Sequence, residues 1–294
     1  MKRKYFIFLG IVAFVTLLYA PIVLATPILG SAQSFAVLGA SGVTNVGSTT
    51  IYGSVGVYPG SSITGFPPGI VTGGVIYPNP PPAPSDQAQS DALNAYNIMK
   101  ILPYTDDKTG VDLGGLTLTP GVYYFATTAS LTGTLALTLD FASDPDGAFV
   151  FQVGTALTTG SSTAVNVING GPESGVYWLM GVTGGTGTGS ATLGSASVFA
   201  GNILALTSIG LDPTAAILCG RAIALEGAVT MSGDNKISNN NFDEDFDSGR
   251  SDFESYGFSG GSGSTAPIPE PATMLLLGSG LIGLAGFARR KFKK

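Results

Sequence analysis

The chain has 294 residues, of which 44% are hydrophobic and only 11% are charged, well below the roughly 25% charged residues of typical globular chains. It contains no histidine and a single cysteine, which removes the commonest general base, the commonest metal ligand and any intramolecular disulfide. Its 13 basic residues gather at the two ends, so the middle of the chain keeps five of them against 18 acidic residues. Without a basic patch to neutralise phosphates, the composition excludes nucleic acid as a partner.

Residues 1–25 are expected to form a secretory signal peptide. A basic KRK start precedes an apolar run that reaches Leu18, and the small residues at Val23–Ala25 suit a signal peptidase. We therefore place cleavage after Ala25. The alternative is a retained membrane anchor, and the protein is exported in either case.

The segment that follows, residues 26–238, has the pattern of a mainly β domain. Short runs of Val, Ile, Phe and Tyr alternate with Gly, Ser, Thr and Asn, which predicts short strands broken by turns. A proline-rich connector at 75–84 leads to one helix, predicted over 85–102 with Ser85 as N-cap and Pro103 beyond its end. One face of this helix is expected to pack on the β domain and to bind no ligand. It consists of Ala88, Ala92, Ala95, Tyr96 and Met99.

A weak internal repeat runs through the second half of this domain. Apolar strands headed by glycine begin at Gly121, Gly147, Gly175, Gly201 and Gly220. A period of 20–28 residues is typical of a solenoid, in which each unit buries its apolar face on its neighbours. A β-sandwich with antiparallel hairpins is the structural alternative. The only cysteine, Cys219, lies in an apolar run and is expected to be a buried small hydrophobe.

The acidic residues do not form a pattern that predicts a cofactor or metal site. Asp106-Asp107 lies in a polar loop, where such pairs are usually solvated, and 239–268 reads as an acidic, Gly/Ser-rich linker without the calcium-loop spacing. The glycine-rich run at 184–189 has no following helix or lysine, so it is not a phosphate loop. Four aspartates remain as candidates for a carboxylate pair that cleaves glycans, namely Asp140, Asp144, Asp146 and Asp212. Of these, Asp144, Asp146 and Asp212 occupy turn sequences.

The C-terminal residues 269–294 combine three parts in a fixed order. Pro269-Glu270-Pro271 precedes an apolar run at 272–288, long enough for a transmembrane helix, and a basic end. This arrangement resembles the PEP-CTERM sorting signal. The resemblance implies transient inner-membrane insertion, processing by an exosortase, and release or cell-surface attachment in a Gram-negative bacterium that makes exopolysaccharide. An ordinary tail anchor is the alternative.

Six phrases in order make the middle of the chain similar to the microbial ice-binding (antifreeze) protein family. They are LGSAQSFAVLGASGVTNVG, GSVGVYPGSSITGFPPG, DLGGLTLTPGVYYF, GAFVFQVGTALTT, FAGNILALTSIGL and GRAIALEGAVT. The resemblance covers residues 29–237 and implies an irregular right-handed β-helix with a long helix alongside. It also implies adsorption to ice and its ordered water through one flat face.

Some members of that family carry Thr-Ala/Gly-x-Thr/Asn motifs on the ice-binding face. Three such motifs occur here, and they make candidate contacts of Thr155, Thr158, Thr163, Asn166, Thr183 and Thr186. The alternative for each motif is a threonine in a turn or packed in a strand, and the glycine-rich insertion puts Thr183 and Thr186 in a loop.

Three functions are open at this point. The first is an exported ice-binding protein that inhibits ice growth or recrystallisation. The second is a structural or adhesive component of an exopolysaccharide matrix, as in a biofilm, because the sorting signal carries no information about ice. The third is a glycan-cleaving enzyme, which the absence of histidine and of a clear carboxylate pair disfavours. No cofactor is expected for any of the three.

Overall fold

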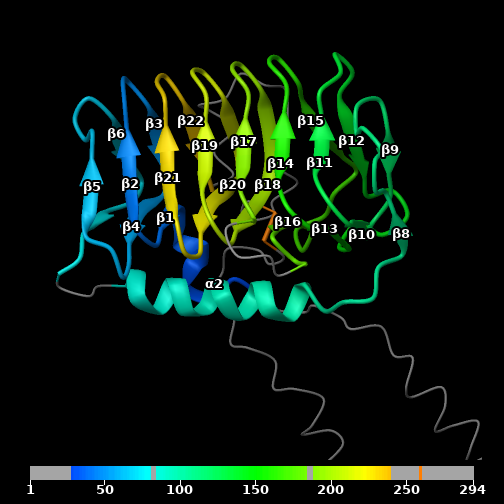
Figure 1. The fold of residues 1–294 in the computed structure, drawn as a ribbon, viewed down its shortest axis with the longest axis horizontal. Helices are drawn as coiled ribbons and strands as arrows, with labels where there is room; N and C mark the ends of the chain where they lie inside the picture. The colour runs from blue at the N-terminus through cyan, green and yellow to red at the C-terminus, as the bar shows by residue number, and fades with distance from the viewer. Residues whose placement is uncertain (1–27, 81–83, 184–187, 240–257, 260–294) are drawn as a thin grey trace, which may run out of the picture.

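The computed structural model describes residues 28–80, 84–183, 188–239 and 258–259, and these residues form parallel sheets with one long helix alongside (Figure 1). Sheet A holds β1 (Phe35–Gly39), β3 (Thr50–Tyr52), β4 (Ser54–Val57), β6 (Ile70–Thr72), β7 (Ile76–Tyr77), β8 (Asp106–Asp107), β10 (Gly121–Phe125), β13 (Ala148–Val153), β16 (Gly175–Met180), β18 (Val198–Ala205), β20 (Ala216–Ala224) and β22 (Lys236–Ser238). Sheet B holds β2 (Gly42–Asn45), β5 (Ser62–Thr64), β11 (Ala129–Leu131), β14 (Leu157–Thr159), β17 (Ala191–Leu193), β19 (Ile209–Leu211) and β21 (Ala228–Met231). Sheet C holds β9 (Thr117–Leu118), β12 (Leu137–Asp140) and β15 (Val165–Ile168).

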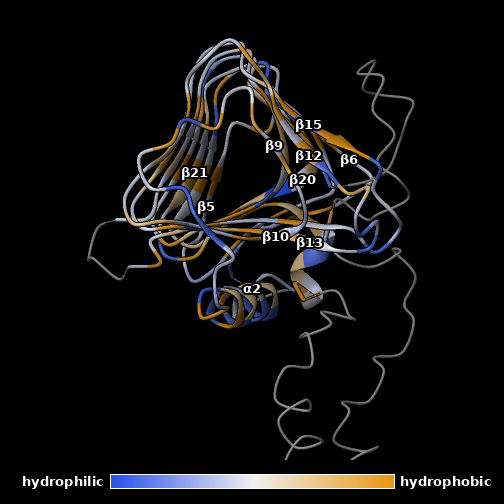
Figure 2. Cartoon of the chain, turned by 90° about the vertical axis from the view of Figure 1, so that its right-hand side faces the viewer, coloured by the Kyte–Doolittle hydropathy of each residue, from blue (hydrophilic) through white to orange (hydrophobic). Residues whose placement is uncertain are grey.

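The chain visits three walls in turn, and together they enclose the core as a triangle seen end-on (Figure 2). From β13 it passes to β14 in sheet B, to β15 in sheet C and back to β16 beside β13. The long strands β18 and β20 bend at a register shift after Ala200. The first half of each strand extends sheet C, as the bridge between Ala164 and Val198 shows. The second half of each strand continues the part of sheet A that contains β10, β13 and β16. We call the wall beneath the helix the helix wall, and the wall that continues sheet C the third wall.

Every pairing between named strands in the described ranges is parallel. This excludes the antiparallel sandwich, because hairpin-connected neighbours would pair antiparallel. It also confirms the repeat, since the five glycine-headed units supply β10, β13, β16, β18 and β20, which are consecutive neighbours in sheet A. Cys219 is only partly buried and has φ = 56°, next to the bend of β20.

The N-terminal strands pair with the C-terminal strands. β1 pairs with β20, β2 with β21 and β3 with β22, each in parallel register. The first circuit of the chain therefore stacks on the last one, and β4 to β7 add the outermost circuit beyond it. In Figure 1 the blue N-terminal strands accordingly lie beside the yellow C-terminal strands.

Helix α2 (Ser85–Met99) runs along the outside of the helix wall. The predicted packing face is confirmed: Ala88, Ala92, Ala95, Tyr96 and Met99 are all buried. They pack against side chains that point outward from the wall, namely Val150, Tyr177, Leu179, Leu204 and Ile223. The Tyr96 hydroxyl also donates to the carbonyl of Met180 at 3.2 Å. The helix is thus held by apolar contact and by hydrogen bonds to the wall.

The helix begins at residue 85 as predicted, but its N-cap and its C-terminal end differ from the prediction. The helix ends at Met99 rather than Leu102, because Pro103 disfavours the helical conformation in the residue before it and the chain turns with a bond from Leu102 N to Met99 O. Ser85 is the first helical residue and Pro84 is the N-cap, without a side-chain capping bond. Asp86 lies in the first turn, where a carboxylate interacts favourably with the helix dipole.

The interior is lined with aromatic rings that stack along neighbouring strands. Phe151 on β13 and Trp178 on β16 stack with ring centroids 3.7 Å apart and planes 7° from parallel. Tyr123 continues the stack at 5.4 Å from Phe151, and Phe199 packs against Trp178 at 5.0 Å with its plane tilted by 50°. The buried Trp178 indole donates to the carbonyl of Ala200 at 3.1 Å, so its polar edge is also satisfied.

Several predicted segments lie outside the described residues. These are the signal peptide at 1–25, including Ala25, the run at 272–288, and the sorting motif Pro269, Glu270 and Pro271. Among the residues that are described, no helix combines the length and the apolar character needed to cross a bilayer.

We expect Trp178→Ala to lower the free energy of unfolding by about 3–5 kcal/mol, because it removes a fully buried ring from the middle of the aromatic stack. The measurement is urea unfolding followed by far-UV circular dichroism. Ile101→Ala is the matched control, since this side chain is 76% exposed and its loss should change stability by about 0.5 kcal/mol or less. Equal effects of the two substitutions would contradict the described core.

Candidate functional site

Sheet B presents a straight row of small side chains on its outer surface. In each strand the residues beside the central one are mostly buried, so the central side chain points away from the core. Strand pairing places these central residues in register from β11 to β5. We call this set the central row: Ser130, Thr158, Thr192, Gly210, Thr230, Thr44 and Thr64.

A second row consists of the residues two positions before each member of the central row, either on the strand or directly before its first residue. Gly42 pairs with both Ala228 and Ser62, and backbone bonds align the remaining members of this row. The members are Thr128, Ala156, Ser190, Ser208, Ala228, Gly42 and Ser62. Because all of them are small, the outer surface of sheet B has no large side chain along either row.

The seven strands of sheet B contain no Asp, Glu, Lys or Arg. Carboxylates lie only outside these strands: Asp212 directly follows β19, and Glu226 lies two residues before β21. Beyond the edge strand β11, Asp112 bridges to Ser130 and accepts from the Thr132 hydroxyl at 2.6 Å. Burial acts to raise the pKa of Asp112, but hydrogen bonds from Thr132 and from backbone amides outweigh it and lower that pKa. The central row therefore ends at an ionised group and is neutral along its length.

The other two walls differ from sheet B. The helix wall is covered by α2. The third wall carries a shorter polar row of Thr117, Thr138 and Asn166 in register, but charged residues also lie on its strands, with Asp140 on β12 and Lys236 on β22. Within the described residues, sheet B is therefore the wall whose strands carry no charged side chain and that no helix covers.

The structure separates the six threonine and asparagine candidates. Thr158 lies in the central row and is exposed. Thr155 borders the second row, with its hydroxyl 3.1 Å from that of Thr128. Thr163 is buried and donates to the Gly160 carbonyl at 3.0 Å, as a turn threonine does. Asn166 is exposed on the third wall.

The described residue of the third motif, Thr183, does not lie on sheet B. The Thr183 hydroxyl donates to the Gly154 carbonyl at 2.8 Å in the turn after β16, and Thr186 lies outside the described residues. The structure thus brings only Thr155 and Thr158 together at one surface, and only Thr158 into the central row.

Most of the central row was missed by the motif, because its members do not share the Thr-x-x-Thr spacing. The signal that four members share is an outward threonine placed between two buried residues, as in Val229-Thr230-Met231 and Ala191-Thr192-Leu193. That pattern predicts an outward threonine in a strand, but only strand pairing shows that successive ones align.

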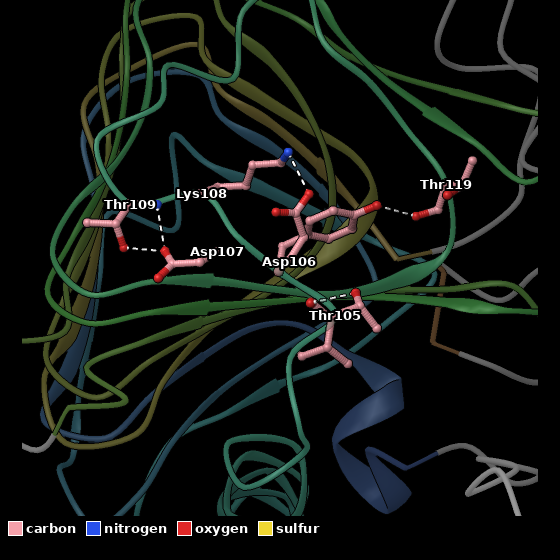
Figure 3. A network of polar contacts seen from close by, with 8 residues as sticks. Thr105, Asp106, Asp107, Lys108, Thr109 and Thr119 are labelled. Atoms are coloured by element: carbon pink, nitrogen blue, oxygen red, sulfur yellow. Dashed lines mark hydrogen bonds and ion pairs between the residues drawn. The ribbon is translucent and has the colours of Figure 1, made fainter.

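The end of the helix wall is closed by a polar network (Figure 3). Lys108 pairs with Asp106 at 2.6 Å, and Asp107 accepts from the amide and the hydroxyl of Thr109. Both aspartates are exposed on the edge strand β8, where charged side chains discourage another strand from pairing. Across the described ranges, no group of three or more His, Cys, Asp or Glu residues could hold a metal ion.

Comparison with protein families gives two matches on separate parts of the chain. Residues 37–237 match the ice-binding-like family, and residues 267–291 match the PEP-CTERM protein-sorting motif. An ice-binding protein of Nostoc sp. (strain HG1) is 43% identical over 295 residues, which cover 100% of this chain and 98% of that protein.

Solved structures agree with the sequence comparison. A crystal structure of an ice-binding protein from an Antarctic biological consortium superposes with a TM-score of 0.65 at 39% identity, covering 72% of this chain and 91% of the other. The ice-binding protein of the Antarctic ascomycete Antarctomyces psychrotrophicus superposes with a TM-score of 0.62 at 38% identity, covering 71% and 96%.

Proposed function

The chain belongs to the ice-binding-like family, and from this premise we propose that it is an exported ice-binding protein that adsorbs to ice through the outer surface of sheet B. Adsorption there inhibits ice growth or recrystallisation. One observation carries the choice of surface: the central row is in register over seven strands, lacks a side chain only at Gly210 and carries no charge.

The chemistry of this surface suits ice better than that of the other two walls. Ice offers no ionic partner, so a charged side chain would lose its hydration without a compensating interaction. A threonine presents a methyl group and a hydroxyl together. On paired strands these groups repeat at about 4.7–4.9 Å and are already ordered before contact, which lowers the entropy cost of binding.

We assign the ice contacts to the threonines of the central row, with Thr158 near one end and Thr44 and Thr64 at the other. Thr155 remains a candidate at the border of the surface. Thr163 is unsuited to this role because its side chain is buried, and Asn166 and Thr183 do not lie on this surface.

We also propose the finer description of the fold as an irregular right-handed β-helix. The circuit from helix wall to sheet B to third wall supports it, as do the related solved structures. The sorting-motif match supports export to the surface of a Gram-negative bacterium, with signal-peptidase cleavage after Ala25 and exosortase processing near Pro269-Glu270-Pro271.

The second candidate is a structural or adhesive component of an exopolysaccharide matrix. The observation that favours it is the sorting motif, which concerns export alone. The two candidates separate in one experiment: a folded, purified protein that fails to inhibit ice recrystallisation yet is retained by the polysaccharide of its host would support the matrix role.

Thr158→Tyr should reduce ice recrystallisation inhibition about tenfold or more, a free-energy change of ~1.4 kcal/mol, because the ring protrudes from a surface of small side chains. Thermal hysteresis of residues 26–266 provides a second measurement. The control is Thr117→Tyr, which places the same ring at an exposed strand position on the third wall. Full activity of a folded Thr158→Tyr protein would move the contact surface away from sheet B.

Gly210→Thr should increase the same activity a few-fold, because glycine is the only member of the central row without a side chain. A Cβ at Gly210 would meet nothing within 4 Å, and its φ lies outside the left-handed region. Gly210→Ala is the matched control, since it adds the Cβ without a hydroxyl. If Gly210→Thr lowers activity while thermal stability is unchanged, continuity of the row is not what ice recognises.

A further inference from the structure

Two residues near the C-terminus pack into the domain although the sequence places them in a linker. Phe258 is 2% exposed and joins the main core, and Ser259 is fully buried. Ser259 forms an antiparallel bridge with Gly175, and the Val176 amide donates to the Phe258 carbonyl at 2.8 Å. The folded domain therefore extends beyond residue 238, and we call this pair the clip.

The receptor for the clip is a buried polar cluster drawn from distant parts of the chain. Asn202 donates from Nδ2 to the Phe258 carbonyl at 2.8 Å, and Gln33 donates from Nε2 to the Ser259 hydroxyl at 2.7 Å. The fully buried Arg221 donates to Asn202 Oδ1 at 2.7 Å, which fixes the amide so that Nδ2 faces the clip. A preorganised set of donors of this kind holds a backbone segment at a defined place.

Arg221 also ties the receptor to the N-terminal segment. Its Nε and one terminal nitrogen donate to the Gln33 carbonyl at 3.0 and 2.8 Å, and Asn239 donates to the same carbonyl at 2.9 Å. Gln33 belongs to the short helix η1 (Gly30–Ser34) that precedes β1. The clip thus contacts Gln33 in the region where the first and last circuits of the chain pair.

The position of the clip relative to sheet B follows from the course of the chain. Each circuit runs from the helix wall to sheet B, then to the third wall, and returns to the helix wall. Gly175 opens β16, so it lies at the corner between the third wall and the helix wall. In a triangular section this corner is opposite sheet B. Figure 1 draws the clip in orange, beside the β16 label.

We propose that the clip fixes the exit of the C-terminal tail at the edge opposite sheet B. The sorting-motif match begins at residue 267, eight residues after Ser259, and eight residues span about 29 Å at most. A cell surface that holds the tail therefore meets this edge, and the central row faces away from it toward ice. That this orientation serves ice binding rests on the proposed function, whereas the position at which the tail leaves the domain does not.

The test is a distance measurement between two spin labels on the full chain in detergent, with Cys219→Gly to remove the native thiol. Glycine suits position 219 because its φ is positive. Labels go on Thr230→Cys in the central row and on Ser262→Cys, three residues after the clip. We expect one narrow distance peak, and a broad distribution when Phe258→Asp expels the clip. The proposal is overturned if the doubly labelled protein that keeps Phe258 gives a distance distribution as broad as that expected for Phe258→Asp. This outcome is decisive even if Phe258→Asp does not fold.

Hydrogen exchange supplies a local readout without labels. In Phe258→Asp the Val176 amide loses its acceptor, so its exchange should accelerate at least tenfold while that of the Leu157 amide, bonded to the Ser190 carbonyl in sheet B, stays the same. Unchanged exchange at Val176 contradicts a docked clip. Neither measurement uses ice, so a failure here is distinct from a failure of ice binding, which recrystallisation assays report.

Discussion

Parallel pairing in strict register is the constraint on which the rest of this structure depends. Because side chains alternate between the two faces of a strand, a slip of one residue would turn every threonine of the central row into the core and every apolar neighbour outward. The aromatic stack inside the walls resists that slip, since Phe151 and Trp178 are partners in the same ladder that aligns β13 with β16. The same strand register therefore sets both the packing of the interior and the alignment of side chains on the outer surface.

The closure of the first circuit on the last extends this constraint across the whole sequence. Thr44 stands beside Thr230 only because β2 pairs with β21, although 186 residues separate them. Arg221 and Asn239 stabilise this closure from the opposite edge by their bonds to the Gln33 carbonyl. A long row of small side chains thus depends on a polar cluster that no part of it contacts.

Local periodicity predicted much of this architecture and little of the surface. The alanine face of α2 could be identified because helical spacing is set within a few residues, and the glycine-headed strands could be identified because each repeats the same short pattern. The pairing of β1 with β20 could not, because consecutive circuits of a solenoid are expected to be neighbours and this pair is not consecutive. Thr163 matched a motif but lies buried in a turn, because a four-residue motif does not record on which side of the backbone a hydroxyl falls. Phe258 was assigned to a linker because the sequence around it is acidic and rich in Gly and Ser, whereas its burial depends on a receptor assembled from distant segments of the chain.

The meeting of the two chain ends at Gln33 has a consequence for how such a domain can be combined with others. Gln33, a few positions from the first described residue, donates a hydrogen bond to Ser259, the last described one, so the chain enters and leaves the domain at one place. A unit whose ends lie side by side can be inserted within a loop of a second protein without separating the two halves of that loop. The closure that aligns the central row therefore also makes this fold a portable module for larger architectures.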